Sequence, residues 1–203
     1  MKLISISGLD GSGKTTQLDL IEKSLKKKFK LKRFHMIDFS IANRILKKPS
    51  KNKSRNNRQL QAKTKAGLVA IMLRKIAIII DVFSFRFYYL IKSAENKTDY
   101  LLVDRYFYDQ IINIKYLDKN SSRERNPFWQ KVVENQIIQP FLKIYLKVNF
   151  QEVLKRDRKI EQGEKYLQEK KVLYDSLSKK WRLRIIDGNK NKQKIQQKIK
   201  ILL

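Results

Sequence analysis

The fold of this chain is decided by one short stretch, Gly8-Leu9-Asp10-Gly11-Ser12-Gly13-Lys14-Thr15. It matches the phosphate-loop pattern G-x-x-x-x-G-K-[ST] at every fixed position. Residues 2–7 before it read as a short buried strand, and residues 15–28 after it have the apolar spacing of an amphipathic helix. Strand, glycine loop and helix together point backbone N–H groups and a helix N-terminus at phosphate oxygens. The stretch therefore predicts a nucleotide site, with Lys14 directed at the β- and γ-phosphates and Thr15 at Mg²⁺.

The composition sets limits on the class of protein. With 203 residues, the chain is long enough for one domain, 1–203, and no linker or internal repeat divides it. The absence of cysteine excludes disulfides and thiolate metal sites, and a single histidine, His35, excludes a histidine-cluster metal centre. The apolar run before Asp10 is too short for a signal peptide, so we expect a cytoplasmic protein.

The formal net charge of +28 invites a nucleic-acid interpretation. The excess is mostly lysine and is spread over the whole chain, with runs at 26–28 and 190–200 that read as solvated faces. A positive field would still attract nucleotide phosphates. We therefore expect no dedicated nucleic-acid partner.

A second phosphate-binding segment is predicted at residues 100–106. Residues 100–104 read as a central parallel strand that ends at Asp104, at the sheet edge where ligands bind in open α/β sheets. An aspartate there can hold Mg²⁺ directly or through water. Arg105 follows and is suited to bidentate binding of a second phosphate. Alone, the two residues would read as an ion pair at a strand end; the phosphate loop favours ligand binding.

The remaining pattern alternates strands and helices, which predicts a parallel sheet covered by helices on both faces. Further strands are expected at 31–37, 141–148 and 183–186. Further helices are expected at 66–92, 107–116, 127–138, 151–155, 165–177 and 195–203. The polar and basic stretch 43–65 is expected to be a mobile loop.

The helix predicted at 66–92 is rich in Ile, Leu, Phe and Tyr. Charged residues interrupt it too often for a membrane span: Arg74, Lys75, Asp81 and Arg86. We expect a buried helix or a subunit interface, which would make the protein a homodimer. Asp81 and Arg86 read as structural polar residues, with the alternative that Arg86 reaches a ligand.

At this point the chain resembles the thymidylate kinase family. Four segments carry the resemblance: Gly8 to Gln17, Asp104-Arg105-Tyr106, Arg158-Lys159-Ile160-Glu161 with Tyr166 and Tyr174, and Ile185-Ile186-Asp187. Together they span almost the whole chain. The resemblance implies a P-loop NTPase fold with about five parallel strands, ATP as phosphate donor, Mg²⁺, and a lid at about 156–166. It implies phosphorylation of a nucleoside monophosphate, with dTMP to dTDP as the expected reaction.

The resemblance also implies residue roles. In the family, the acid matching Asp10 contacts the acceptor sugar, and the arginine matching Arg105 holds the acceptor phosphate. The tyrosine matching Tyr106 lies against the deoxyribose. Closure of the lid would bring Arg156 or Arg158 over the transferring group. The donor site would comprise Gly8, Leu9, Asp10, Gly11, Ser12, Gly13, Lys14, Thr15 and Thr16.

Two departures from the family leave the acceptor base open. The family has Glu-Pro-Gly-Gly-Thr after its second strand, whereas this chain reads Ile37-Asp38-Phe39-Ser40-Ile41-Ala42-Asn43-Arg44. The helical arginine that reads thymine is matched only roughly, by Arg74 or Arg86. A related phosphotransferase with another phosphorylated acceptor stays open. So do a nucleic-acid-associated P-loop ATPase, for which no water-activating glutamate or glutamine is apparent, and a non-catalytic binding protein.

Overall fold

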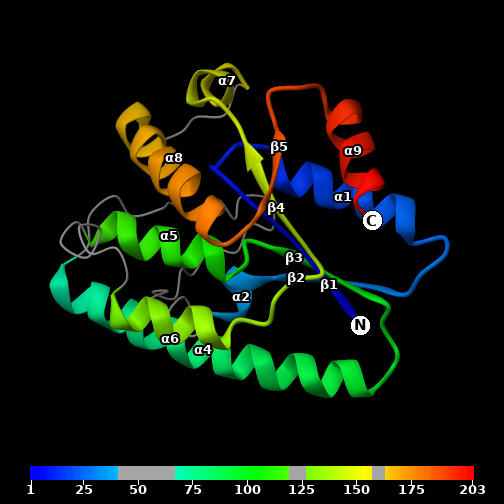
Figure 1. The fold of residues 1–203 in the computed structure, drawn as a ribbon, viewed down its shortest axis with the longest axis horizontal. Coiled ribbons are helices and arrows are strands. Elements are labelled where there is room, and N and C mark those ends of the chain that lie inside the picture. Colours follow the sequence, from blue (N-terminus) through cyan, green and yellow to red (C-terminus); the bar gives the residue numbers. More distant parts are fainter. Residues whose placement is uncertain (41–66, 119–126, 157–162) are drawn as a thin grey trace, which may run out of the picture.

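The computed structural model describes residues 1–40, 67–118, 127–156 and 163–203. Its centre is a parallel sheet of five strands in the order β2-β3-β1-β4-β5 (Figure 1). The strands are β1 (Lys2–Ser7), β2 (Leu31–His35), β3 (Tyr100–Asp104), β4 (Leu142–Lys147) and β5 (Arg184–Asp187). The predicted sheet of about five parallel strands is confirmed.

Helices cover both faces of this sheet. They are α1 (Lys14–Leu25), α2 (Met36–Phe39), α4 (Leu68–Ala94), α5 (Phe107–Leu117), α6 (Phe128–Gln136), α7 (Phe150–Lys155), α8 (Gly163–Lys180) and α9 (Lys192–Ile201). One hydrophobic core joins the sheet to α4, α5, α6 and the second half of α8. The other joins it to α1, α7, α9 and the start of α8. Two separate cores explain why the central strands carry apolar residues on both faces.

The strand register places the two predicted phosphate-binding segments side by side. The central strand β1 pairs with β3 so that Ile6 lies opposite Asp104. The phosphate loop begins two residues after Ile6, and β3 ends at Asp104. Because both strands run in the same direction, the loop and Asp104 emerge at the same carboxyl edge of the sheet.

Most predicted elements are confirmed within about three residues at each end, and one predicted strand is cut short by a helix. The strand expected at 31–37 ends at His35, because residues 36–39 form the short helix α2. The expected loop at 43–65 lies outside the described residues, as do 157–162 of the expected lid; its last residues, 163–166, begin α8.

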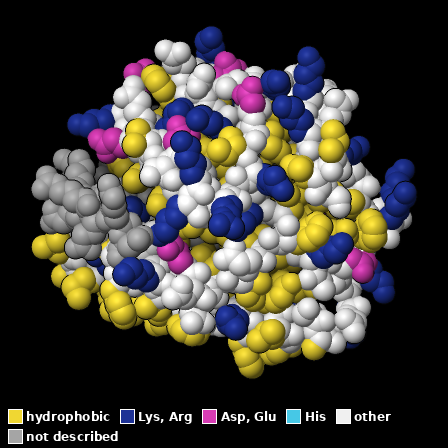
Figure 2. Space-filling model, viewed as in Figure 1, with side chains coloured by type: hydrophobic (Ala, Val, Ile, Leu, Met, Phe, Trp, Pro, Cys, Tyr) yellow, Lys and Arg dark blue, Asp and Glu magenta, His cyan; other side chains and the backbone are white. Residues whose placement is uncertain are grey.

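Two predictions concern the surface. No helix in the described ranges has the length and apolarity needed to cross a membrane. Lys and Arg side chains are scattered over the face seen in Figure 2, which agrees with the even spread of lysine along the sequence. Hydrophobic side chains gather instead along the lower edge of that view, where Figure 1 places α4 and α6.

Candidate phosphoryl-transfer site

The phosphate loop has backbone conformations that demand glycine. Gly13 has a φ of 94° and directly precedes α1. At Gly8, an added Cβ would lie 2.7 Å from the carbonyl oxygen of Leu146. The start of α1 has no side-chain cap, so its first amides are left to bind an anion. The glycines therefore give the loop the shape that a phosphate group requires.

Lys14 lies folded across its own loop. Its ammonium donates to the carbonyl oxygens of Gly8 and Leu9, at 2.8 Å and 2.6 Å, and the side chain is buried. Burial lowers the pKa of Lys14, with Arg105 adding to this effect and nearby carboxylates opposing it. Burial thus works against the charged form of Lys14, and a bound phosphate would favour it.

The predicted Mg²⁺ pair, Thr15 and Asp104, is brought together. The Thr15 hydroxyl donates to Asp104 Oδ2 at 3.0 Å. The other oxygen, Oδ1, is buried and has no hydrogen-bond partner among the described residues, and the same is true of Ser12 Oγ in the loop. Because buried polar atoms are usually paired, these two oxygens fit a site that is completed by a magnesium nucleotide.

Arg33 is a neighbour of Asp104 that the sequence did not indicate. Its guanidinium lies 3.9 Å from Asp104 Oδ2 and also pairs with Asp19 and Glu22 of α1. This arginine is the third of the five residues of β2, and no motif in the sequence marks it. It connects three elements beside the predicted metal site.

Arg156, predicted to lie on the lid, reaches the phosphate loop. It follows the last residue of α7 and donates to the carbonyl oxygens of Ser12 at 3.1 Å and Gly188 at 2.7 Å. Its partner in the prediction, Arg158, lies outside the described residues. Thr16 is exposed in the first turn of α1, and Leu9 is buried.

Asp10 is the centre of a second group of side chains, here named the Asp10 cluster: Asp10, Arg105, Tyr166 and Lys170. Asp10 Oδ1 lies 2.7 Å from Arg105 Nη2. Asp10 Oδ2 accepts from the Tyr166 hydroxyl at 2.8 Å and lies 3.7 Å from Lys170 Nζ. Burial by itself would raise the pKa of Asp10, but Lys170, Arg105, Lys14 and the Tyr166 hydrogen bond hold it well below the ordinary value.

Asp109 is a buried acid beside this cluster. It accepts hydrogen bonds from Ser7 Oγ at 2.7 Å, the Gly8 amide at 3.3 Å and the Tyr174 hydroxyl at 2.6 Å. Burial raises its pKa, opposed chiefly by Lys14. Sequence reasoning missed Asp109, although an acid in the first turn of a mostly apolar helix, five residues after Asp104, was a usable signal.

The backbone leaves the extended conformation at Arg105. This residue has a φ of 59°, in the left-handed region. The strand stops at Asp104, and a local turn directs Arg105 toward Asp10. A non-glycine residue held in this conformation is often found at a functional site.

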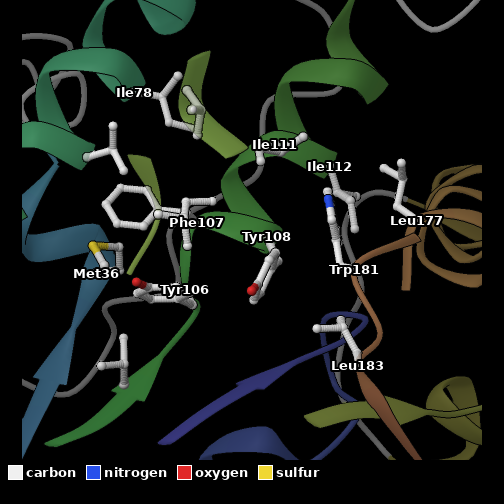
Figure 3. Close-up of a cluster of buried hydrophobic side chains, with 14 of the residues drawn as sticks. Met36, Ile78, Tyr106, Phe107, Tyr108, Ile111, Ile112, Leu177, Trp181 and Leu183 are labelled. Carbon is white, nitrogen blue, oxygen red and sulfur yellow. The ribbon is translucent and has the colours of Figure 1, made fainter. Parts of the chain in front are cut away.

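Two predicted acceptor residues lie elsewhere. Tyr106 is fully buried in the core with Phe107 and Tyr108 (Figure 3), and its hydroxyl donates to the Ile138 carbonyl at 2.7 Å. Arg86 lies on the exposed side of α4 and donates to Gln136 of α6 at 3.5 Å. The structure thus brings Asp10 and Arg105 together, but Tyr106 and Arg86 do not join that pair.

The comparisons with known proteins address the fold. A solved structure of thymidylate kinase from Candida albicans matches 99% of this chain and 90% of its own chain, with a TM-score of 0.63 and 18% sequence identity. No protein-family model and no curated protein matches the sequence. At this level of identity the likeness concerns architecture alone. The chain therefore has the α/β P-loop NTPase fold seen in thymidylate kinase.

Proposed function

We propose that this protein transfers a phosphoryl group from ATP to a nucleoside monophosphate. The observation that carries the proposal is that two groups, a candidate Mg²⁺ pair and a candidate phosphate-binding arginine, are adjacent at one sheet edge. Thr15 and Asp104 lie on the donor side, and Arg105, the next residue, pairs with Asp10. A nucleotide hydrolase needs only the first group, whereas a kinase must align two phosphates.

On the donor side, the loop amides and Lys14 would hold the ATP phosphates, and Thr15 and Asp104 would hold Mg²⁺. When bound, Mg²⁺ neutralises charge on the phosphate oxygens. The residues fit this role because Asp104 Oδ1 and Ser12 Oγ are buried without partners in the described part of the chain. Lys14 and Arg156 would stabilise the negative charge on the transferring group.

On the acceptor side, Arg105 would bind the acceptor phosphate and Asp10 the acceptor sugar. We propose dTMP as the first acceptor, giving dTDP, with another phosphorylated acceptor as the alternative. The exposed position of Arg86 leaves base recognition to other residues, and the core position of Tyr106 leaves the sugar contact to Asp10. The Candida albicans thymidylate kinase structure is described as revealing the origin of broad substrate specificity, which favours testing several bases.

The experiment is a panel of monophosphates with Mg-ATP, scored for ADP release and for the diphosphate product. We expect acceptor-dependent turnover, greatest with dTMP, that is lost in Lys14→Ala. ADP release that does not depend on any monophosphate would instead indicate a hydrolase. Preference for a different monophosphate would retain the kinase and replace the acceptor.

We also propose a homodimer through α4. Ten large hydrophobic side chains of this helix are exposed: Leu68, Val69, Met72, Leu73, Ile76, Ile80, Phe83, Phe87, Leu90 and Ile91. At about 100 Å² each, they would bury on the order of 1,000 Å² per copy, which is the size class of a stable interface. A second copy of the chain offers a matching uncharged surface.

The dimer is tested by sedimentation velocity of Phe87→Glu, at a residue that is 67% exposed. We expect a monomer, because a carboxylate would be buried in an apolar interface. The matched control is Val172→Glu on α8, at a residue that is 68% exposed; it should sediment as the wild type does. A monomeric wild-type protein would contradict the proposal.

A further inference from the structure

Lys170 is a buried cation that the roles proposed so far leave unused. It lies on α8 and is 2% exposed. The next residue, Lys171, is partly exposed and pairs with Asp175 one turn along the same helix, at 2.7 Å. A buried ammonium is costly unless it is compensated. The position of Lys170 therefore has to be explained by its partners.

These partners lie in the Asp10 cluster. Tyr166 and Lys170 are four residues apart, so both project from the same face of α8. Lys170 Nζ donates to the Tyr166 hydroxyl oxygen at 2.6 Å, and that hydroxyl donates to Asp10 Oδ2 at 2.8 Å. Lys170 Nζ also lies 3.7 Å from Asp10 Oδ2 itself. Lys170 thus acts on one oxygen of Asp10 both directly and through Tyr166.

The other oxygen of Asp10 faces Arg105, whose Nη2 is 2.7 Å from Oδ1. An arginine and a carboxylate prefer a bidentate pair, in which two N–H groups bind two oxygens. Tyr166 and Lys170 compete with Arg105 for the second oxygen, because the Tyr166 hydroxyl donates to it and the Lys170 ammonium lies nearby. Among the described residues Arg105 is ion-paired with Asp10 through Oδ1, so it retains N–H donors for a phosphate.

We propose that Lys170 is a positioning residue that keeps Arg105 available for the acceptor phosphate by holding one oxygen of Asp10. The inference rests on the proposed function, because it assumes that Arg105 binds the acceptor. It assigns a role to a lysine that no motif of the sequence marks.

The charge of the site fits this role. Lys14, Arg105 and Lys170 face two carboxylates, Asp10 and Asp109, so these five side chains carry one more positive charge than negative charges. Burial lowers the pKa of Lys170 to about 8, with Arg105 and Lys14 acting in the same direction and Asp10 and Asp109 opposing it. At a pH of about 8, a phosphate monoester is a dianion. Its binding would therefore favour the protonated form of Lys170.

The first test is steady-state kinetics of the full chain with dTMP and Mg-ATP. Lys170→Met removes the ammonium with little change in length. We expect the KM for dTMP to rise about tenfold or more, with the KM for ATP changing by less than about threefold. Lys171→Met, one residue away, is the control and should match the wild type. Lys170→Arg retains the charge and should restore most of the affinity for dTMP.

The second test is calorimetric titration of the wild-type protein with dTMP at about pH 8.5, in two buffers of different ionisation enthalpy. We expect proton uptake on binding, because the phosphate raises the pKa of Lys170. The uptake should be absent in Lys170→Met and present in Lys171→Met. A role confined to packing α8 would produce no such uptake.

The outcomes separate this inference from the proposed function. A folded Lys170→Met protein with the wild-type KM for dTMP would overturn the inference and leave the kinase intact. If Lys170→Met does not fold, binding of dTMP by the wild-type protein without proton uptake overturns it instead. A wild-type protein that neither turns over nor binds any monophosphate would overturn both.

Discussion

The two sides of the site are built in different ways. On the donor side, charged side chains bind the backbone: Lys14 donates to two loop carbonyl oxygens, and Arg156 to two others. On the acceptor side, side chains bind side chains: Asp10 meets Arg105 from the end of β3 and Tyr166 from α8. The Lys14 contacts are local in sequence, whereas the Arg156 contact with Ser12 and the Tyr166 contact with Asp10 join residues 144 and 156 positions apart.

This difference has consequences for how each side responds to substitution. A backbone partner stays in place when a side chain is changed, so a donor-side variant should lose its charge without disturbing its neighbours. In a side-chain cluster, removing one member leaves buried groups without partners, which affects stability as well as binding.

Lys14→Ala should abolish phosphoryl transfer and leave the protein folded. Loss of one preorganised charge from the transferring group costs at least ~3 kcal/mol in the transition state, or more than about a hundredfold in rate. The measurement is kcat/KM with dTMP, together with circular dichroism. Lys23→Ala, an exposed lysine of the same helix, is the control. Near-normal turnover by folded Lys14→Ala would contradict the kinase proposal.

Asp104→Ala should reduce turnover roughly a hundredfold at every acceptor concentration, because the predicted Mg²⁺ ligand is lost. The fold should persist, since the buried carboxylate accepts from Thr15, which is exposed and can bind water instead. Turnover is measured against Mg²⁺ concentration at saturating dTMP. A variant that regains full activity at high dTMP would place Asp104 on the acceptor side.

Arg105→Ala should act on the other substrate. We expect the KM for the acceptor to rise by about tenfold or more and kcat to fall, with ATP affinity little changed. Each substrate is varied in turn, and ATP is titrated against the folded variant. Loss of ATP binding with an unchanged acceptor KM would remove the distinction between the two sides and indicate a nucleotide hydrolase.

The same contrast explains what the sequence could reveal. The phosphate loop, Asp104 and the alternation of strands with helices follow from local patterns. A loop that binds phosphate through its backbone, for example, requires glycines at fixed spacing. Lys170 could not be found in this way. It is one of 47 lysines and arginines, and its burial depends on how α8 packs against the loop. Tyr106 shows the opposite case, since a matched motif position lies in the core.

Asp109→Ala should lower the free energy of unfolding by about 2–4 kcal/mol. The substitution leaves Ser7 Oγ, the Gly8 amide and the Tyr174 hydroxyl without their buried acceptor. Urea unfolding measures the change, and Asp175→Ala is the control, because Asp175 is partly exposed and water can replace it. Equal stability of the two variants would show that the three hydrogen bonds to Asp109 add no net stability.

Asp10→Asn tests the smallest effect, the electrostatic contribution of the Asp10 cluster to stability. The folded pKa of Asp10 lies below its ordinary value of 3.8, because Lys170 and Arg105 outweigh the effect of burial. The unfolded state therefore binds more protons near pH 4, so the ionised carboxylate stabilises the fold above that pH. Its contribution is lost as the pH falls below about 4.

We expect Asp10→Asn to be about 1–2 kcal/mol less stable than the wild type at pH 7 and the difference to shrink below about pH 4. Urea unfolding from pH 2.5 to 7, with equal m values confirming the same transition, measures both quantities. Parallel stability curves for the two proteins would mean that the cationic neighbours of Asp10 do not stabilise its ionised form. The side-chain cluster would then contribute no electrostatic stability that distinguishes it from the backbone-bound donor side.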